Sequence, residues 1–148
     1  MTWIIALSVV VADRISKWIC QTSLQPLGSV PVIKGIFHLT YVENRGAAFG
    51  ILQNKTWFFI PATLIILVIL LYMLIRVKTN SKLMRVSLAL IAGGAVGNLI
   101  DRIWLGYVVD FLDFRIWPVF NIADSSVVVG ALILGYLVLV KGEGISYG

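Results

Sequence analysis

Long apolar runs separated by short polar clusters dominate the pattern of this chain. Each run approaches the roughly 20 residues that a helix needs to cross the hydrocarbon of a bilayer at 1.5 Å per residue. The four runs lie at residues 3–22, 57–76, 83–104 and 119–140. The pattern predicts an all-α membrane protein, a four-transmembrane-helix bundle that forms one integral-membrane domain over residues 1–148.

The first run needs charged residues to reach a membrane-spanning length, because it is apolar only as far as Ala12. Its helix must therefore continue through the next charged positions. Asp13 and Lys17 are four residues apart, so they share a helix face and can pair. A pair that faces the bundle costs far less than two separate charges facing lipid. We expect the pair to lie inside the bundle, either as a structural contact or as a support for an active site.

Composition and charge agree with a membrane protein and argue against a nucleic-acid partner. The chain is 59% hydrophobic and 13% charged, whereas soluble domains average about 25% charged residues. The net charge of +5 is concentrated between the second and third runs. Such basic residues mark a cytoplasmic connection, so both termini are predicted to be cytoplasmic, with segments 21–56 and 105–118 on the outer side. The basic residues of that connection are Arg76, Lys78, Lys82 and Arg85.

The outer segment, at about 30–55, differs from the apolar runs. Residues 36–42 are rich in aromatic and β-branched side chains with partial alternation, which indicates a strand. Residues 46–50 are mainly small, so backbone can approach another chain closely there. We therefore expect a small extracytoplasmic β-sheet at the membrane surface. One histidine and one cysteine, His38 and Cys20, give no metal-site spacing, and neither a metal nor another cofactor is expected.

Carboxylates gather near the outer ends of the third and fourth runs. Helix rise places Asp101 about 27 Å, and Asp124 about 24 Å, above the cytoplasmic ends of their helices. Each carboxylate shares a helix face with an asparagine three residues earlier, Asn98 and Asn121 respectively. Asp110 lies in the outer connection, which is long enough to fold back over the same region. Ionisable groups at this depth are costly and usually functional.

Two neighbouring carboxyl groups are sufficient for peptide hydrolysis. The chain contains no Ser/His triad, no HExxH and no Walker loop. When two carboxyls are close, one stays protonated. The ionised carboxylate takes a proton from water, and the protonated one polarises the scissile carbonyl. From the residues alone, either Asp101 or Asp110 could partner Asp124, while an ion pair of Asp101 with Arg102 or Arg45 would be the structural alternative.

Five motifs, in order, resemble the lipoprotein signal peptidase (signal peptidase II) family of bacterial inner membranes. They cover most of the chain, and together they are far more specific than any one alone. They are residues 13–17 (DRISK), 43–49 (ENRGAAF), 93–102 (GGAVGNLIDR), 108–111 (VVDF) and 120–124 (FNIAD).

The resemblance implies an intramembrane aspartic endopeptidase that removes signal peptides from diacylglyceryl-modified prolipoproteins, cleaving before the lipidated cysteine. By the family pattern the catalytic pair falls on Asp110 and Asp124, with the outer sheet as a cradle over the substrate. The enzyme is expected to be a multi-pass monomer in contact with membrane lipid, with its site near the outer leaflet. The substrate-binding and supporting residues would be Asn44, Gly46, Asn98, Asp101, Arg102, Asn121, Ala123, Asp13 and Lys17.

A proton-coupled transporter or a structural membrane subunit is the competing class, since buried aspartates also serve proton relays. Transporters usually bind near the bilayer midplane and often contain internal repeats. Here the carboxylates lie toward one face and no repeat is visible. The sequence therefore favours the protease.

Overall fold

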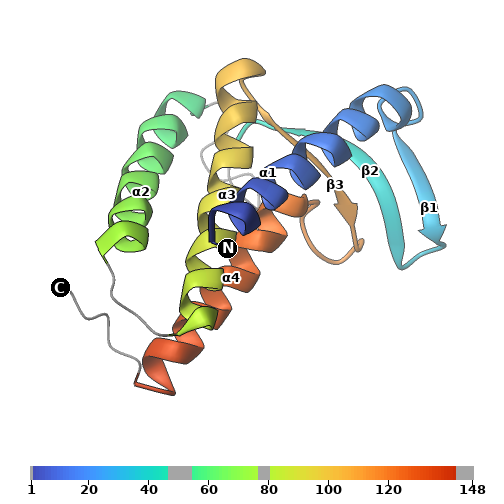
Figure 1. Ribbon diagram of the computed structural model, residues 1–148. Helices are drawn as coiled ribbons and strands as arrows, with labels where there is room; N and C mark the ends of the chain where they lie inside the picture. Colours follow the sequence, from blue (N-terminus) through green and yellow to red (C-terminus); the bar gives the residue numbers. More distant parts are fainter. Residues whose placement is uncertain (1, 47–54, 77–80, 143–148) are drawn as a thin grey trace.

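The computed structural model describes residues 2–46, 55–76 and 81–142. It is mostly helical, with a small antiparallel sheet that extends sideways from the helices (Figure 1). The elements in order are helix α1 (Thr2–Ile19), the π-helical turn η1 (Cys20–Leu24), strands β1 (Ser29–Ile33) and β2 (Phe37–Asn44), helices α2 (Thr56–Arg76) and α3 (Lys82–Trp104), strand β3 (Val108–Asp113) and helix α4 (Ile122–Leu139).

Three helices are long and apolar enough to cross a membrane among the residues described. They are α2, over Trp57–Ile75, and the whole of α3 and of α4. Helix α1 has 18 residues, but three of them are charged: Asp13, Arg14 and Lys17. It is therefore not counted among the helices that are apolar enough to cross a membrane. The described residues thus form a helical membrane protein with three helices that are able to span a bilayer, and the predicted count of four is not reached by this measure.

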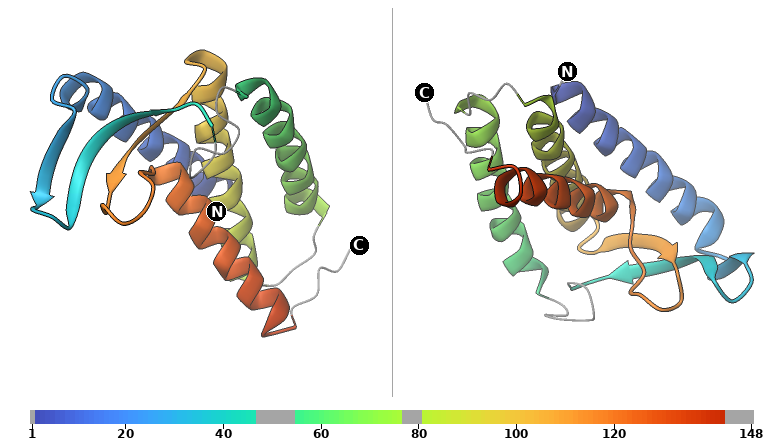
Figure 2. Two further views of the ribbon diagram at one scale, coloured as in Figure 1. Left: turned by 180° about the vertical axis from the view of Figure 1, so that it is seen from behind. Right: turned by 90° about the horizontal axis from the view of Figure 1, so that it is seen from below.

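Helix α3 is the centre of the bundle, since it packs against α1, α2 and α4 (Figure 2). Glycines allow two of these contacts to be close. A methyl group on Gly93 would lie 2.7 Å from the carbonyl oxygen of Ala6 in α1, and one on Gly94 would clash with the carbonyl oxygen of Ala123 in α4. The backbones of three helices therefore meet near the middle of α3, next to its polar residues.

The sheet has the strand order β1-β2-β3, and both pairs are antiparallel. The predicted outer segment 30–55 supplies β1 and β2, while residues 47–54 lie outside the described part of the chain. Strand β3 corrects the expectation that 105–118 is only a connection. A β-bulge between Leu39 and Val42 lies opposite β3, so that Val42 is the partner of Asp110. The sheet therefore presents Asp110 at the end that adjoins the helices.

Two predicted boundaries differ from the structure for local reasons. The run 3–22 continues as η1 instead of as a regular α-helix. The run 119–140 becomes helical only at Ile122, because Phe120 forms backbone hydrogen bonds with Leu112 and extends the sheet by one bridge. Asn121 then caps α4 in an extended conformation. The start of α4 is consequently tied to β3.

Candidate active site

Asn121 and Asp124 form a capping box at the start of α4. The side-chain oxygen of Asn121 accepts a hydrogen bond from the backbone N–H of Asp124 at 2.8 Å, and Asp124 Oδ2 accepts one from the backbone N–H of Asn121 at 3.3 Å. Such reciprocal bonds satisfy donors that a helix start leaves unpaired. They hold the Asp124 carboxylate at the helix N-terminus, where the helix dipole favours negative charge.

The same asparagine also binds Asp110. Asn121 Nδ2 donates to Asp110 Oδ1 at 2.7 Å, so one residue contacts both aspartates. The second oxygen of Asp110 accepts a hydrogen bond from Asn44 Nδ2 at 2.8 Å. Asn44 is oriented in turn, because its own oxygen accepts from the backbone N–H of Gly46 at 3.0 Å. The sheet and the capping box therefore hold the Asp110 carboxylate from both sides.

Asn98 of α3 connects Asp124 to a buried cation. Its Nδ2 donates to Asp124 Oδ1 at 2.7 Å. Its Oδ1 accepts hydrogen bonds from Lys17 Nζ at 2.9 Å and from Asn121 Nδ2 at 3.1 Å. Each oxygen of Asp110 and of Asp124 thus accepts at least one N–H from a side chain or from the backbone.

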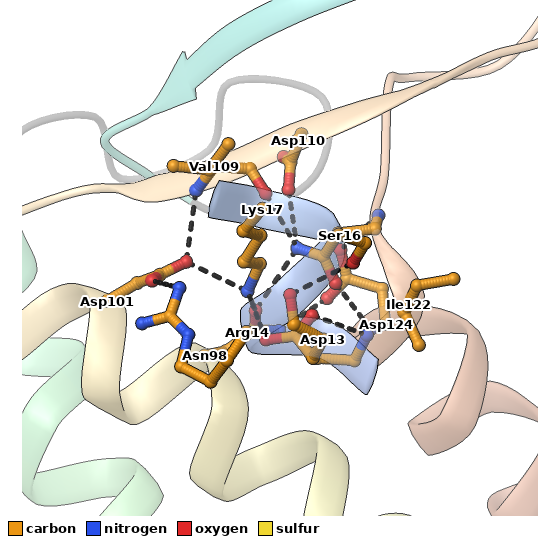
Figure 3. A network of polar contacts seen from close by, with 12 residues as sticks. Asp13, Arg14, Ser16, Lys17, Asn98, Asp101, Val109, Asp110, Ile122 and Asp124 are labelled. Atoms are coloured by element: carbon orange, nitrogen blue, oxygen red, sulfur yellow. Dashed lines mark hydrogen bonds and ion pairs between the residues drawn. The ribbon is translucent and has the colours of Figure 1, made fainter. Parts of the chain in front are cut away.

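Lys17 lies at the centre of a buried charge cluster close to Asp110 and Asp124 (Figure 3). Its ammonium group is 2.8 Å from Asp13 Oδ2 and 2.8 Å from Asp101 Oδ2, and all three side chains are fully buried. The pairing predicted for Asp13 with Lys17 is confirmed. Asp13 also accepts a hydrogen bond from the backbone N–H of Ala123 at 3.1 Å, which links α1 to the start of α4.

Asp101 binds cations and backbone, away from Asn121. Asp101 forms ion pairs, as the structural alternative to a catalytic role had it, but its partners are Lys17 and Arg14 in place of Arg102 or Arg45. Its Oδ2 also accepts from the backbone N–H of Val109 at 3.2 Å, immediately before Asp110 in β3. Asp101 therefore holds β3 against the helices. Arg45 instead pairs with Glu43.

Arg102 lies along the other side of the polar network. Its guanidinium is 5.0 Å from the centre of the Phe59 ring of α2, and its Nη1 lies 3.5 Å from the backbone oxygen of Asn98. The guanidinium group is attracted by the negative charges of three nearby aspartates, Asp124, Asp110 and Asp101, and the attraction of Asp124 is the strongest. Arg102 therefore contributes positive charge to the carboxylate region without a salt bridge to Asp101.

The environment of Asp110 favours its protonated form. Burial, followed by the negative charge of Asp124, raises the pKa of Asp110 to about 7, although the hydrogen bonds from Asn44 and Asn121 act in the opposite direction. Because the charge of Asp124 is one cause of this shift, the protonation of Asp110 depends on that of Asp124. One can then act as an acid while the other acts as a base, which is the arrangement that peptide hydrolysis needs.

Two contributors to this network, Arg14 and the backbone N–H of Val109, were not predicted from the sequence. Arg14 was within the first motif but received no role, although its neighbours Asp13 and Lys17 marked that face of the helix as charged. The backbone N–H of Val109 has no signal in a sequence pattern.

The described residues contain no group of three His, Cys, Asp or Glu side chains that could hold a metal. His38 lies on strand β2, where its Nδ1 is 3.4 Å from Ser29 Oγ.

Comparisons with known proteins agree along nearly the whole chain. Residues 5–140 match the family model described as signal peptidase (SPase) II. The chain is 57% identical over 143 residues to the lipoprotein signal peptidase of Caldanaerobacter subterraneus subsp. tengcongensis, covering 96% of this chain and 98% of that protein. It is 52% identical over 141 residues to the lipoprotein signal peptidase of Moorella thermoacetica, covering 95% and 94%.

Two solved structures share the fold. Both are described as bacterial membrane enzymes determined by the in meso method, at 2.3 Å and 1.9 Å resolution. The first superposes with a TM-score of 0.89 at 38% identity, over 96% of this chain and 89% of that chain. The second gives 0.85 at 39% identity, over 95% and 93%. A match of this extent shows that the chain belongs to the signal peptidase II family of aspartic peptidases.

Proposed function

We propose that the protein removes signal peptides from diacylglyceryl-modified bacterial prolipoproteins, cleaving before the lipidated cysteine, with Asp110 and Asp124 as its catalytic residues. One observation carries the assignment. Asn121 contacts both carboxylates, through its side chain to Asp110 and through its backbone to Asp124. The third candidate, Asp101, has its oxygens taken up by Arg14, Lys17 and the Val109 amide.

The two carboxyls divide the chemistry between them. Asp110, whose pKa is raised to about 7, holds the shared proton and donates a hydrogen bond to the scissile carbonyl. Asp124 takes a proton from the attacking water. The tetrahedral intermediate then collapses: the C–N bond breaks, and the leaving nitrogen receives a proton from the pair. Water supplies the hydroxyl group of the new carboxylic acid and the proton that the leaving amine gains, so no cofactor takes part.

The remaining residues orient the pair and its substrate. Asn44 and Asn98 hold the carboxylates, and Gly46 orients Asn44. Ala123 anchors the start of α4 to Asp13, while Lys17 and Asp101 tie α1 to α3. Arg102 supplies positive charge beside the aspartates. In this proposal the asparagines and Arg102 also bind the substrate backbone.

The burial pattern of α1 supports a fourth membrane crossing. Asp13 and Lys17 are fully buried in the bundle, so their charges do not face lipid. The exposed side of the helix is a stripe of large apolar residues that begins with two neighbours and then recurs every three or four positions, which suits a lipid-facing surface. These residues are Trp3, Ile4, Leu7, Val11, Ile15 and Trp18.

Four crossings complete the proposed topology. The protein would be one integral domain of the bacterial inner membrane, with both termini cytoplasmic and its site near the outer leaflet. The basic connection between α2 and α3 supports that orientation. A monomer is sufficient, because one chain supplies both Asp110 and Asp124. The acyl chains hold the substrate in the outer leaflet, where each buried CH₂ contributes about 0.8 kcal/mol, so the peptide can approach sideways.

A cleavage assay with purified enzyme tests the proposal. Lipidated prolipoprotein should lose the mass of its signal peptide, while the unlipidated precursor should be cleaved poorly. Asp110→Asn and Asp124→Asn should each lower turnover by several orders of magnitude, because an amide cannot exchange the proton. Asp113→Asn is the matched control: Asp113 is on the same strand but binds Thr40 and Arg115. Normal turnover by folded Asp110→Asn would transfer its role to Asp101.

A further inference from the structure

The first turn of α2 carries three consecutive aromatic residues, Trp57, Phe58 and Phe59. Trp57 is 70% exposed and Phe58 is 46% exposed, whereas Phe59 is half-buried. Phe59 is thus the member of the three that turns toward the protein. Figures 1 and 2 show this turn beside the C-terminal end of α3, the end that carries Arg102.

Phe59 contacts Arg102 through the face of its ring. The carbon atom at the centre of the guanidinium lies over the ring, 5.0 Å from its centroid. A cation within about 6 Å of that point is attracted by the electron-rich face of the ring. Phe58 lies nearly at a right angle to Phe59, with 5.7 Å between the ring centroids, a favourable geometry that steadies the Phe59 ring.

This mode of contact leaves the hydrogen-bond donors of Arg102 available. A guanidinium carries five N–H donors in its plane, and an aromatic ring covers the face of the group instead of these donors. Within the described part of the chain, Arg102 donates one hydrogen bond, at 3.5 Å to the backbone oxygen of Asn98, and forms no ion pair. The cation is therefore held beside the aspartates while most of its N–H groups can still bind another molecule.

The apolar attachment of α2 to the bundle lies elsewhere. Leu70 packs in a buried cluster with Met84 and Leu88 of α3 and Leu137 of α4. Helix rise places Leu70 about 16 Å along α2 from Phe59. A change at the Phe59 ring should consequently leave α2 attached, so the contact with Arg102 can be weakened in a folded protein.

We propose that Phe59 is a positioning residue of the active site, whose ring holds the Arg102 guanidinium beside Asp124 and Asp110 with its N–H groups left for the substrate. This role rests on the proposed function, in which Arg102 binds the substrate backbone. Without the ring, the long arginine side chain samples further rotamers and can turn its donors to the carboxylates. Helix α2 thereby contributes to the site, although it carries none of the residues assigned to catalysis or to substrate binding.

Fluorination of the ring tests the contact with little change in its shape. Mono-, di- and trifluorophenylalanine at position 59 withdraw electron density from the ring face in steps and so weaken its attraction for a cation. The kcat/KM for the lipidated prolipoprotein should fall with each added fluorine, by about 5- to 30-fold in total. The same series at Phe58 is the matched control, and its kcat/KM should stay within about twofold of the parent value.

Two simple substitutions give an independent check. Phe59→Tyr keeps an aromatic ring and should retain the kcat/KM of the parent enzyme. Phe59→Leu keeps an apolar side chain without a ring, and it should lose as much as the trifluorinated enzyme. A role in packing alone would be met by leucine as well as by the fluorinated rings.

The thermal midpoint tests the contact without any need for activity. Trifluorination at position 59 should lower the midpoint more in the parent than in Arg102→Gln, which has no cation for the ring to hold. Equal midpoint differences in the two backgrounds would overturn the proposal. An unchanged kcat/KM across the fluorinated series at Phe59, or an equal fall at Phe58, would do the same. A parent enzyme that leaves the lipidated substrate intact would instead count against the proposed function, and the midpoints would still decide whether Phe59 holds Arg102.

Discussion

Lys17 Nζ donates to Asn98 Oδ1 at 2.9 Å, and this hydrogen bond decides which end of the Asn98 amide faces Asp124. An ammonium group can only donate, so the amide oxygen must turn toward Lys17. The amide nitrogen then points to Asp124 Oδ1 at 2.7 Å. A charge in α1 thereby controls the hydrogen bonding of a proposed catalytic carboxylate in α4, although the two do not touch.

Replacing the cation should affect folding and activity separately. Lys17→Met leaves Asp13 buried without its partner, which costs roughly 3–5 kcal/mol, and should lower the thermal midpoint in detergent. Lys17→Met with Asp13→Leu removes that buried charge and should recover part of the midpoint. Turnover of the double variant should stay about 100-fold low, the cost of a misplaced group, because Asn98 has lost its charged donor and keeps only the 3.1 Å hydrogen bond from Asn121. Equal midpoints for the single and double variants would argue against the buried pair.

Close helix contacts make a second prediction. Gly94→Ala places a methyl group against Ala123 O and 2.8 Å from Val127 Cγ2, so α3 and α4 must separate. Overpacking of this kind costs about 1–3 kcal/mol, and it should also lengthen the contact from Asn98 to Asp124. Gly135→Ala in α4 is the control, because nothing lies within 4 Å of its added methyl group. The midpoint temperature of thermal unfolding and the turnover rate should fall for Gly94→Ala only. Comparable behaviour of the two alanines would contradict the tight packing.

The helices were the most predictable part of the structure, because their signal is local. Helices α2 and α3 begin and end within one residue of the predicted runs 57–76 and 83–104. Strand β3 was not predicted, since its residues 108–113 form a strand only by pairing with β2, nearly 70 positions earlier in the chain. The late start of α4 has the same cause, a bridge between Phe120 and Leu112.

For the site, spacing identified the residues but not their partners. Asn121 and Asp124 share a helix turn, so a spacing of three was informative. Helix rise placed Asp101 and Asp124 at similar depth, yet depth does not say which way a carboxylate points. The ion pair between Arg14 and Asp101 joins residues 87 positions apart and depends on how α1 crosses α3. Only the resemblance to the family favoured Asp110.

The two candidate partners of Asp124 should respond differently to the same substitution. Asp101→Asn weakens the contacts with Arg14 and Lys17, so the main loss should be a few kcal/mol of stability. The asparagine oxygen can still accept from Val109, which keeps β3 in place. Turnover per folded molecule should therefore stay within about tenfold of the parent, equivalent to 1.4 kcal/mol. A loss as large as that of Asp124→Asn, in a folded Asp101→Asn enzyme, would identify Asp101 as catalytic.

The last prediction concerns pH. The pair needs one shared proton, and the pKa of Asp110 lies at about 7, so kcat/KM should fall as the pH rises through about 7. The hydrogen bond from Asn44 stabilises ionised Asp110 and lowers that pKa. Asn44→Ala should therefore raise the pKa of Asp110. The basic limb of the curve of kcat/KM against pH should then move to higher pH, by at least about one pH unit if the bond is worth the usual 1.5–3 kcal/mol.

Thr40→Val is the matched control for this shift. Thr40 lies on the same strand as Asn44, but its hydroxyl donates to Asp113 and not to Asp110. Its substitution should leave the basic limb where it is in the parent enzyme, even if stability falls slightly. A limb that stays in place in Asn44→Ala, or moves downward, would mean that Asp110 does not hold the shared proton. An equal upward shift in both variants would assign the effect to loosening of β2 rather than to the lost hydrogen bond.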